Sequence, residues 1–258
     1  MRNCLIVAGF ATLLHVAGCG KSGEEAKATS SGSTGGLKPD VANGAKIAGK
    51  VTFTGPKPEL RPIDMSANPA CEKAHPSPVP SEEVVVNNGS LANVFVWVKD
   101  GVPEGKWAAP ATPAVVDQQG CIYKPHVSGV VIGQTVEFRN SDDTNHNIHP
   151  LPRQNEEWNE SQPPKGNPKD KTFDKEEVMI PVKCNIHPWM RAYIGAVRHP
   201  FFAVTGDDGS FSIAGLPPGK YTVEAWHERF GKQDVEVTVA AKDSKTVDFT
   251  FSDKAAAK

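Results

Sequence analysis

Turn residues divide this chain into short segments, and that division limits its fold more than any other feature. Gly and Pro make up 45 of the 258 residues, counted as 23 Gly and 22 Pro. Between the turns, apolar and polar residues alternate with the period of two that marks a half-buried β-strand, as in residues 47–53. No long helical periodicity follows the N-terminal region, and 38% hydrophobic residues still allow a packed core. The sequence therefore predicts an all-β protein.

Length and charge narrow the reading further. A chain of 258 residues is long enough for one large domain or two small ones. Its formal net charge is only −2 at pH 7, so the composition indicates no nucleic acid or other polyanion as a partner.

The N-terminus has the features of an export signal. Residues 4–17 are mostly apolar, have the length of a signal-peptide core and are too short to span a bilayer. Residues 16–19, Val-Ala-Gly-Cys, resemble the lipobox of bacterial lipoproteins, which is cleaved before a Cys that carries lipid on its sulfur. The resemblance implies a signal peptide over residues 1–18 and lipidation at Cys19. An ordinary secretory peptide is the alternative.

A polar segment follows the lipobox. Gly20 rather than Asp follows Cys19, which implies a lipid anchor in the outer membrane of the bacterial cell envelope, facing the periplasm. Residues 19–43 are rich in Gly, Ser, Thr, Ala and Lys and cannot bury enough apolar surface to offset the entropy lost on ordering. We expect them to form a flexible tether.

Two segments carry the side chains of a metal site. Residues 184–190 read Cys-Asn-Ile-His-Pro-Trp-Met, which places a thiolate, an imidazole and a thioether on one loop. Residues 140–149 add further imidazoles after a predicted strand. A Cys and two His in a trigonal set, with a weak axial Met, form the ligand set of a blue-copper site. Soft sulfur suits Cu(I) and imidazole suits Cu(II), so such a set accepts both states.

These segments resemble the cupredoxins and, among them, the amicyanin-like domains. That family has a Cys-x-x-His-Pro-aromatic-Met loop, which residues 184–190 match at every defined position. It also has an Asn, five residues and then His-Asn-Val-His, which residues 140–149 match with Ile in place of Val. The resemblance covers residues 114–198 and implies a Greek-key β-sandwich. It implies one type 1 copper whose equatorial ligands are His146, Cys184 and His187. Met190 would be the axial ligand, and Asn147 would form hydrogen bonds just outside the ligand set.

Other metal chemistries fit these residues less well. A dinuclear copper centre needs a second Cys in the loop, and a multicopper oxidase needs His on both sides of the Cys, where Lys183 and Asn185 stand. Zinc can use the same ligands, but the Met adds little for zinc. His149 competes with His146, although strand alternation places the two on opposite faces. We expect His199 and His227 to be structural.

Two of the five cysteines remain to be assigned, because Cys4 leaves with the signal peptide, Cys19 carries the lipid and Cys184 is a predicted metal ligand. Cys71 and Cys121 form an even pair in an exported, oxidising setting, which favours a disulfide between them. A metal role is the rival reading, because His75 lies near the first Cys and His126 near the second.

The C-terminal part has a different texture. Residues 206–227 combine Gly and Pro turns with alternating Phe, Ile, Tyr and Val, and resemble carboxypeptidase regulatory-like domains, which are transthyretin-like β-sandwiches. We therefore expect a cupredoxin-like domain with an N-terminal extension over residues 44–200 and a small sandwich over 201–253. Residues 47–51 also resemble the first strand of such modules, so the N-terminal stretch has an alternative place in a sandwich of this kind.

Three local expectations concern the strands. Residues 91–99 are apolar on both faces, which is typical of a central strand. Residues 127–132 and 134–139 are expected to form a hairpin around Gly133. Residues 153–172 are polar and rich in Pro and are expected to form a long loop.

Together these features predict a membrane-tethered electron carrier that is not an enzyme. Its partner would be a redox protein, a cytochrome or a dehydrogenase, and electrons would leave through His187, whose ring edge usually lies near the surface of this loop. An envelope binding or adhesion module, using the C-terminal sandwich, is the alternative. Copper storage is a third reading, which the enclosed four-ligand site favours less.

Overall fold

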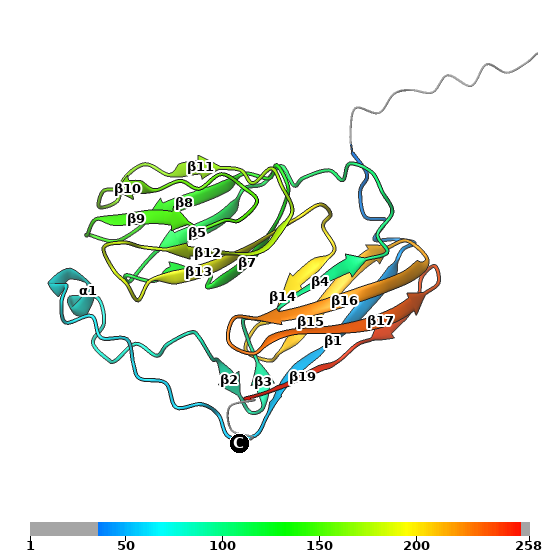
Figure 1. Ribbon diagram of the computed structural model, residues 1–258, viewed down its shortest axis with the longest axis horizontal. Coiled ribbons are helices and arrows are strands. Elements are labelled where there is room, and N and C mark those ends of the chain that lie inside the picture. Colours follow the sequence, from blue (N-terminus) through cyan, green and yellow to red (C-terminus); the bar gives the residue numbers. More distant parts are fainter. Residues whose placement is uncertain (1–35, 254–258) are drawn as a thin grey trace, which may run out of the picture. The chain divides into compact units, whose positions relative to one another are not determined.

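A computed structural model describes residues 36–253 (Figure 1). One short helix and nineteen strands lie in this range, which confirms the all-β prediction. The predicted signal peptide, residues 1–18, and Cys19 lie outside the described residues. Within the described range, none of the helical structure is long and apolar enough to cross a bilayer.

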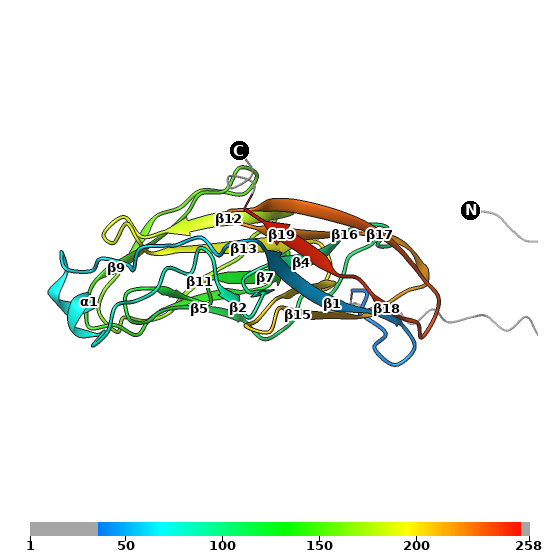
Figure 2. The same ribbon diagram turned by 90° about the horizontal axis from the view of Figure 1, so that it is seen from below.

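Strands from both ends of the chain form what we call the terminal sandwich. They are β1 Ala45–Thr54, β2 Val86–Asn87, β3 Ser90–Leu91, β4 Phe95–Asp100, β14 Phe202–Val204, β15 Ser210–Leu216, β16 Gly219–His227, β17 Gly231–Val239, β18 Ser244–Thr246 and β19 Phe249–Ser252. One sheet has the order β15-β1-β3-β2, with β18 and β19 paired along β1, and the other has the order β14-β4-β16-β17. β1 and β19 lie side by side (Figure 1 and Figure 2) although almost 200 residues separate them, as the pairing of Val51 with Phe249 shows.

The intervening chain forms the central sandwich. Its strands are β5 Ala114–Gln118, β6 Tyr123–Lys124, β7 Val127–Val131, β8 Val136–Asn140, β9 His146–Pro150, β10 Glu160–Gln162, β11 Lys169–Lys171, β12 Glu177–Lys183 and β13 Arg191–Val197. One sheet has the order β10-β9-β12-β13-β7 and the other β11-β8-β5-β6. Inward side chains of both sheets, such as Phe138 and Ile180, share one buried core.

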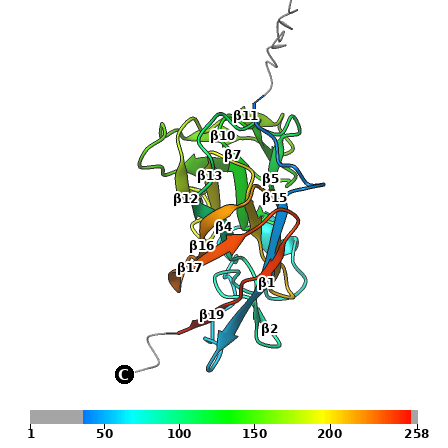
Figure 3. The ribbon, with the colours of Figure 1, turned by 90° about the vertical axis from the view of Figure 1, so that its right-hand side faces the viewer.

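β4 lies between two cores, which explains why both of its faces are apolar. It pairs with β14 on one side and β16 on the other (Figure 1), and Figure 3 also shows β4 next to β16, so the prediction of a central strand is confirmed. Val96 and Val98 belong to the core of the terminal sandwich. Phe95 and Trp97, on the opposite face, pack in a smaller cluster with residues of the central sandwich.

The strand pairing differs from the expected domain limits. The boundary between 44–200 and 201–253 separates β1 from β15 and β4 from β16, although each pair is hydrogen-bonded in one sheet. The N-terminal stretch is therefore part of the terminal sandwich, as the resemblance of residues 47–51 suggests. The physical reason is that the N-terminal strands supply the edges and apolar faces that the C-terminal strands need for a closed core.

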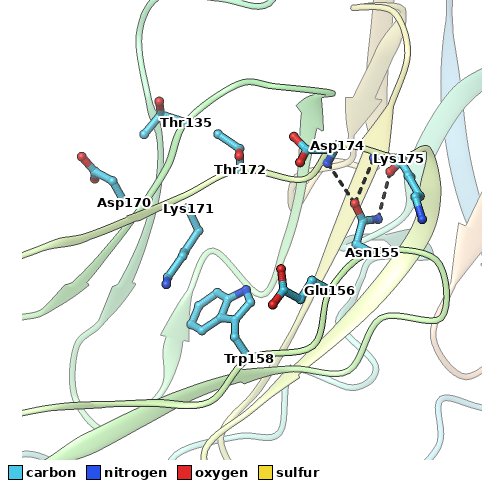
Figure 4. A pocket seen from close by; sticks show the side chains of 9 residues that line it. All are labelled: Thr135, Asn155, Glu156, Trp158, Asp170, Lys171, Thr172, Asp174 and Lys175. Carbon is cyan, nitrogen blue, oxygen red and sulfur yellow. Dashed lines mark hydrogen bonds between the residues drawn. The ribbon is translucent and has the colours of Figure 1, made fainter.

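Two further expectations need correction. β7 and β8 are not a hairpin, because β7 pairs in parallel with β13 and β8 pairs in parallel with β5 in the other sheet. The segment expected as a loop over 153–172 contains β10 and β11. It is held to the next turn by Asn155, which accepts hydrogen bonds from the backbone N–H of Asp174 and Lys175 (Figure 4).

The last part of the predicted tether is also ordered. Within residues 19–43, Leu37 donates a backbone hydrogen bond to Lys106 and accepts one from Ala108. Its pairing with Trp107 forms a parallel bridge, so the chain joins the fold before residue 43. A single backbone bridge of this kind needs few apolar side chains, which is why the composition of the segment does not predict it.

A buried histidine provides a test of the terminal core. Burial, and after it the charge of Arg198, lower the pKa of His199 to about 4. The unfolded chain therefore binds a proton between about pH 6.5 and 4 that the folded chain does not, and stability falls as the pH decreases through this window. We predict that His199→Phe reduces the stability lost between pH 7 and 4.5 by about 2 to 3 kcal/mol in urea unfolding. An unchanged pH dependence would contradict this assignment.

Candidate metal centre

The predicted ligand loop closes a hairpin of the central sandwich. β12 and β13 pair as antiparallel neighbours up to Lys183 opposite Arg191, and residues 184–190 connect them. Two backbone hydrogen bonds close the loop, from Cys184 N–H to the Met190 carbonyl at 3.3 Å and from Met190 N–H to the His187 carbonyl at 2.9 Å. The loop residues thus have fixed positions relative to each other.

Three donor atoms meet beside this loop. His146 begins β9, which lies next to β12 in the same sheet. Its Nδ1 is 2.8 Å from Nδ1 of His187, and Cys184 Sγ is 3.7 Å from the same His187 nitrogen. One ligand atom from each residue lies within 4.8 Å of the others, and all three side chains are buried. Two nitrogens and one sulfur therefore face a common point.

The structure buries Met190, which the resemblance assigns to the axial position. Its side chain is fully buried in the core that also contains Cys184. Asn147 lies as expected between strand and loop. Its backbone N–H donates to Cys184 Sγ at 3.4 Å, and its side-chain oxygen accepts from the backbone N–H of Asn185.

A carboxylate holds the first imidazole. Asp142 Oδ2 is 2.8 Å from His146 Nε2. The backbone N–H groups of Gly120 and Cys121 donate to the two oxygens of Asp142 at 2.6 and 2.7 Å. Burial alone would raise the pKa of Asp142, but these hydrogen bonds, that of His146 first, lower it. A carboxylate that bonds the outer nitrogen of a metal-binding His fixes the ring orientation.

An amide holds the second imidazole. Asn68 Nδ2 is 2.6 Å from His187 Nε2. Asn68 is also the N-cap of α1, Pro69–Lys73, because its Oδ1 accepts from the backbone N–H of Ala70 and Cys71 at 3.1 and 3.3 Å. These two donors fix which end of the amide faces the ring. His187 Nε2 therefore accepts a hydrogen bond, and its ring proton lies on Nδ1.

The segment around α1 covers His187, contrary to the expected surface position. His187 is 1% exposed. Cys71 and Cys121 form a disulfide, the favoured pairing, and Cys71 Sγ is 3.6 Å from His187 Nε2. The disulfide joins α1 to the turn whose backbone holds Asp142. The disulfide thus links the helix capped by Asn68, which contacts His187, to the turn that holds Asp142, which contacts His146.

The local electrostatics favour the metal-binding protonation states of Cys184 and His187 but not of His146. Burial alone would raise the pKa of the Cys184 thiol, but hydrogen bonds from His146 and from Asn147 N–H lower it. Burial, and after it the charge of His146, lower the pKa of His187 to about 4. For His146, burial acts to lower the pKa, but Asp142 and Cys184 outweigh it and raise the pKa. A thiolate and a neutral imidazole are the forms that bind metal.

The remaining predicted histidines lie elsewhere. His149 is turned toward Glu157 and Asn185. His199 and His227 are buried against aromatic rings of the terminal sandwich. His75 bonds the Gly120 carbonyl, and His126 bonds Glu228, so neither joins the cysteines in a metal site.

Sequence reasoning missed Asn68 and Asp142. An Asn before Pro is a recognisable helix N-cap, but nothing local indicates that it meets a histidine 119 residues later. Asp142 stands four residues before His146, a spacing that does carry a weak signal.

Part of the chain matches a known protein family, and part is similar to solved structures. Residues 193–252 match the carboxypeptidase regulatory-like domain family. A search of curated proteins gave no match. Among solved structures, those to which part of the chain is similar include a nitrite reductase, a purple cupredoxin and amicyanin.

A Cu-containing nitrite reductase from Thermus scotoductus SA-01 is 26% identical over 38% of this chain and 25% of its own, with a TM-score of 0.31. A purple cupredoxin from Nitrosopumilus maritimus is 20% identical over 32% of this chain and 98% of its own, with a TM-score of 0.28. A reduced mutant of amicyanin is 25% identical over 34% and 84%, with a TM-score of 0.30. The chain thus spans about a quarter of the length of the reductase.

The disulfide gives a test of the covering segment. It closes a loop of 50 residues, which stabilises a fold by about 4 kcal/mol. We predict that Cys71→Ala with Cys121→Ala lowers the free energy of unfolding by about this amount in urea. The native protein treated with a thiol reductant should approach the variant, and a loss below about 1 kcal/mol would show that the segment is held by other contacts.

Proposed function

We propose that this protein is a type 1 copper protein that carries single electrons. The observation that supports it is the buried meeting of His146 Nδ1, His187 Nδ1 and Cys184 Sγ, with Met190 in the same core. This donor set fits copper, because thiolate and thioether suit Cu(I) and imidazole suits Cu(II). Copper bound there would supply a one-electron couple.

The chain's own residues would keep that centre rigid. Asp142 and the loop hydrogen bonds hold the donors in place, and the covering segment excludes water. Little rearrangement between oxidation states makes electron transfer fast. As part of the same proposal, the protein is a carrier rather than an enzyme, anchored by lipid at Cys19 in the bacterial envelope.

The first test is optical. By the cupredoxin resemblance, adding Cu(II) to the metal-free protein should give an intense absorption at about 600 nm from the Cys–copper bond. Cys184→Ser should abolish this band. The matched control, His149→Gln, should keep it, because His149 faces away from the donors. Binding of Cu(II) without colour would overturn the proposal.

Asn68 gives a second test. Metal at His187 Nδ1 requires the ring proton to move to Nε2, where Asn68 presents an N–H group instead of an acceptor. Asn68→Asp keeps an oxygen to cap α1 and adds a second oxygen to accept from Nε2–H. We predict about tenfold tighter copper binding in competition with a chelator.

The control for this variant is Asn68→Ala, which removes both the N–H group and the acceptor. Its copper affinity should lie below that of Asn68→Asp. If Asn68→Asp binds copper no more tightly than the native protein, the outer nitrogen of His187 does not need an acceptor, and this part of the site is wrong.

A further inference from the structure

The proposed metal position is closed on most sides. His187 is covered by Asn68 and the disulfide, His146 is 0% exposed and held by Asp142, and Met190 is 0% exposed. A protein partner therefore has no direct access to either imidazole. Any partner that exchanges electrons with this site must approach by a different edge than His187.

Cys184 is also buried, at 2% exposed, but this residue borders open space on another side of the site. It lines a cleft of about 540 Å³ between the ligand loop and the two strands that the loop connects. The walls are largely apolar and include Leu151, Pro188 and Tyr193. Ile186, in the middle of the ligand loop, is 46% exposed, which makes it one of the few exposed large apolar side chains in the described range.

Two positive charges also line this cleft. Lys183 and Arg191 both border it and stand directly opposite each other in the β12–β13 pair. Like charges at directly opposed positions destabilise a sheet. Within residues 36–253, neither side chain has a hydrogen bond or an ion pair, and no carboxylate lines the cleft. The residues that line the cleft therefore include no negative charge to balance Lys183 and Arg191.

Acidic groups near the cleft have partners of their own, although Arg191 also borders a second pocket lined by Glu82, Glu83 and Glu228. Glu157 bonds His149, which in turn contacts Asn185 at the cleft. Glu228 bonds His126, whose other nitrogen is 3.1 Å from the Arg191 carbonyl. The charge on Lys183 and Arg191 thus remains available to an outside anion.

We propose that this cleft is the docking surface for an acidic one-electron redox protein, which inserts an apolar protrusion and places its carboxylates against Lys183 and Arg191. The electron path then runs through Cys184, and each electron lost by the reduced partner reduces one copper ion. This inference rests on the proposed function, and it replaces His187 as the exit.

The first experiment needs no metal. Cys184 of the metal-free protein is allowed to react with two small thiol reagents of opposite charge, the anionic sulfonatoethyl and the cationic trimethylammonioethyl methanethiosulfonate. A Cys184→Ala variant gives the baseline for other thiols. The ratio of the two rates removes the effect of thiol ionisation, so it reports the charge along the access path.

Lys183→Glu with Arg191→Glu should lower the anion-to-cation rate ratio by at least about tenfold. Leu151→Trp, which narrows the cleft, should slow both reagents. The matched control, Lys73→Glu on α1, lies on the segment that covers His187 and should leave the ratio within about twofold. An equal effect of Lys73→Glu, or no effect of Leu151→Trp, would show that Cys184 is reached from elsewhere and would overturn the proposal.

The second experiment uses the copper-loaded protein and a matched pair of protein probes. Cytochrome c is basic, and its succinylated form carries carboxylates on the same fold. Stopped-flow electron exchange should be faster with the succinylated form, and Lys183→Glu with Arg191→Glu should reverse that order at low salt. Lys73→Glu should not reverse it. The same order in the double variant as in the native protein would overturn the docking site.

The two experiments separate this inference from the function beneath it. If the copper-loaded native protein exchanges no electrons with either probe, the carrier function fails. The labelling of Cys184 then still decides whether the cleft is a charged path to the sulfur.

Discussion

Three polar side chains share one buried space in this protein, and the rest of the central sandwich is arranged to hold them there. Burying an imidazole or a thiol costs free energy unless its polar atoms have partners. The outer nitrogens of both rings are satisfied by Asp142 and Asn68, and Cys184 accepts a hydrogen bond from Asn147. What these partners leave is a set of inner donor atoms, two nitrogens and one sulfur, that face each other. A metal ion would satisfy all three at once after the ring proton of His187 moves from Nδ1 to Nε2.

The two sandwiches support this arrangement in different ways. In the central sandwich, β9 and β12 are neighbours in one sheet, so His146 and Cys184 are brought together by backbone pairing rather than by a flexible loop. The terminal sandwich contributes through β4, whose second face packs against the central sandwich in the cluster of Phe95 and Trp97. The segment around α1, which follows β1, returns to cover His187. One consequence is that the N-terminal part of the chain both completes the terminal sandwich and closes the metal site.

Some of this follows from the sequence and some does not. The spacing of residues 184–190 predicts three ligands on one loop, because the loop is local and its geometry depends on nearby residues. The apolar residues on both faces of β4 likewise predict a central strand. The contact of Asn68 with His187, the pairing of β1 with β19 and the separation of β7 from β8 all join segments that local patterns do not relate. A period of two states that a segment is a strand, but it does not state which strand is its neighbour.

Copper K-edge X-ray absorption of the copper-loaded full-length protein tests the central claim most directly, because it counts the atoms bound to the ion. The account predicts one sulfur at short distance together with two imidazole nitrogens in the nearest shell. A nearest shell of nitrogen and oxygen alone, with no sulfur, would contradict it.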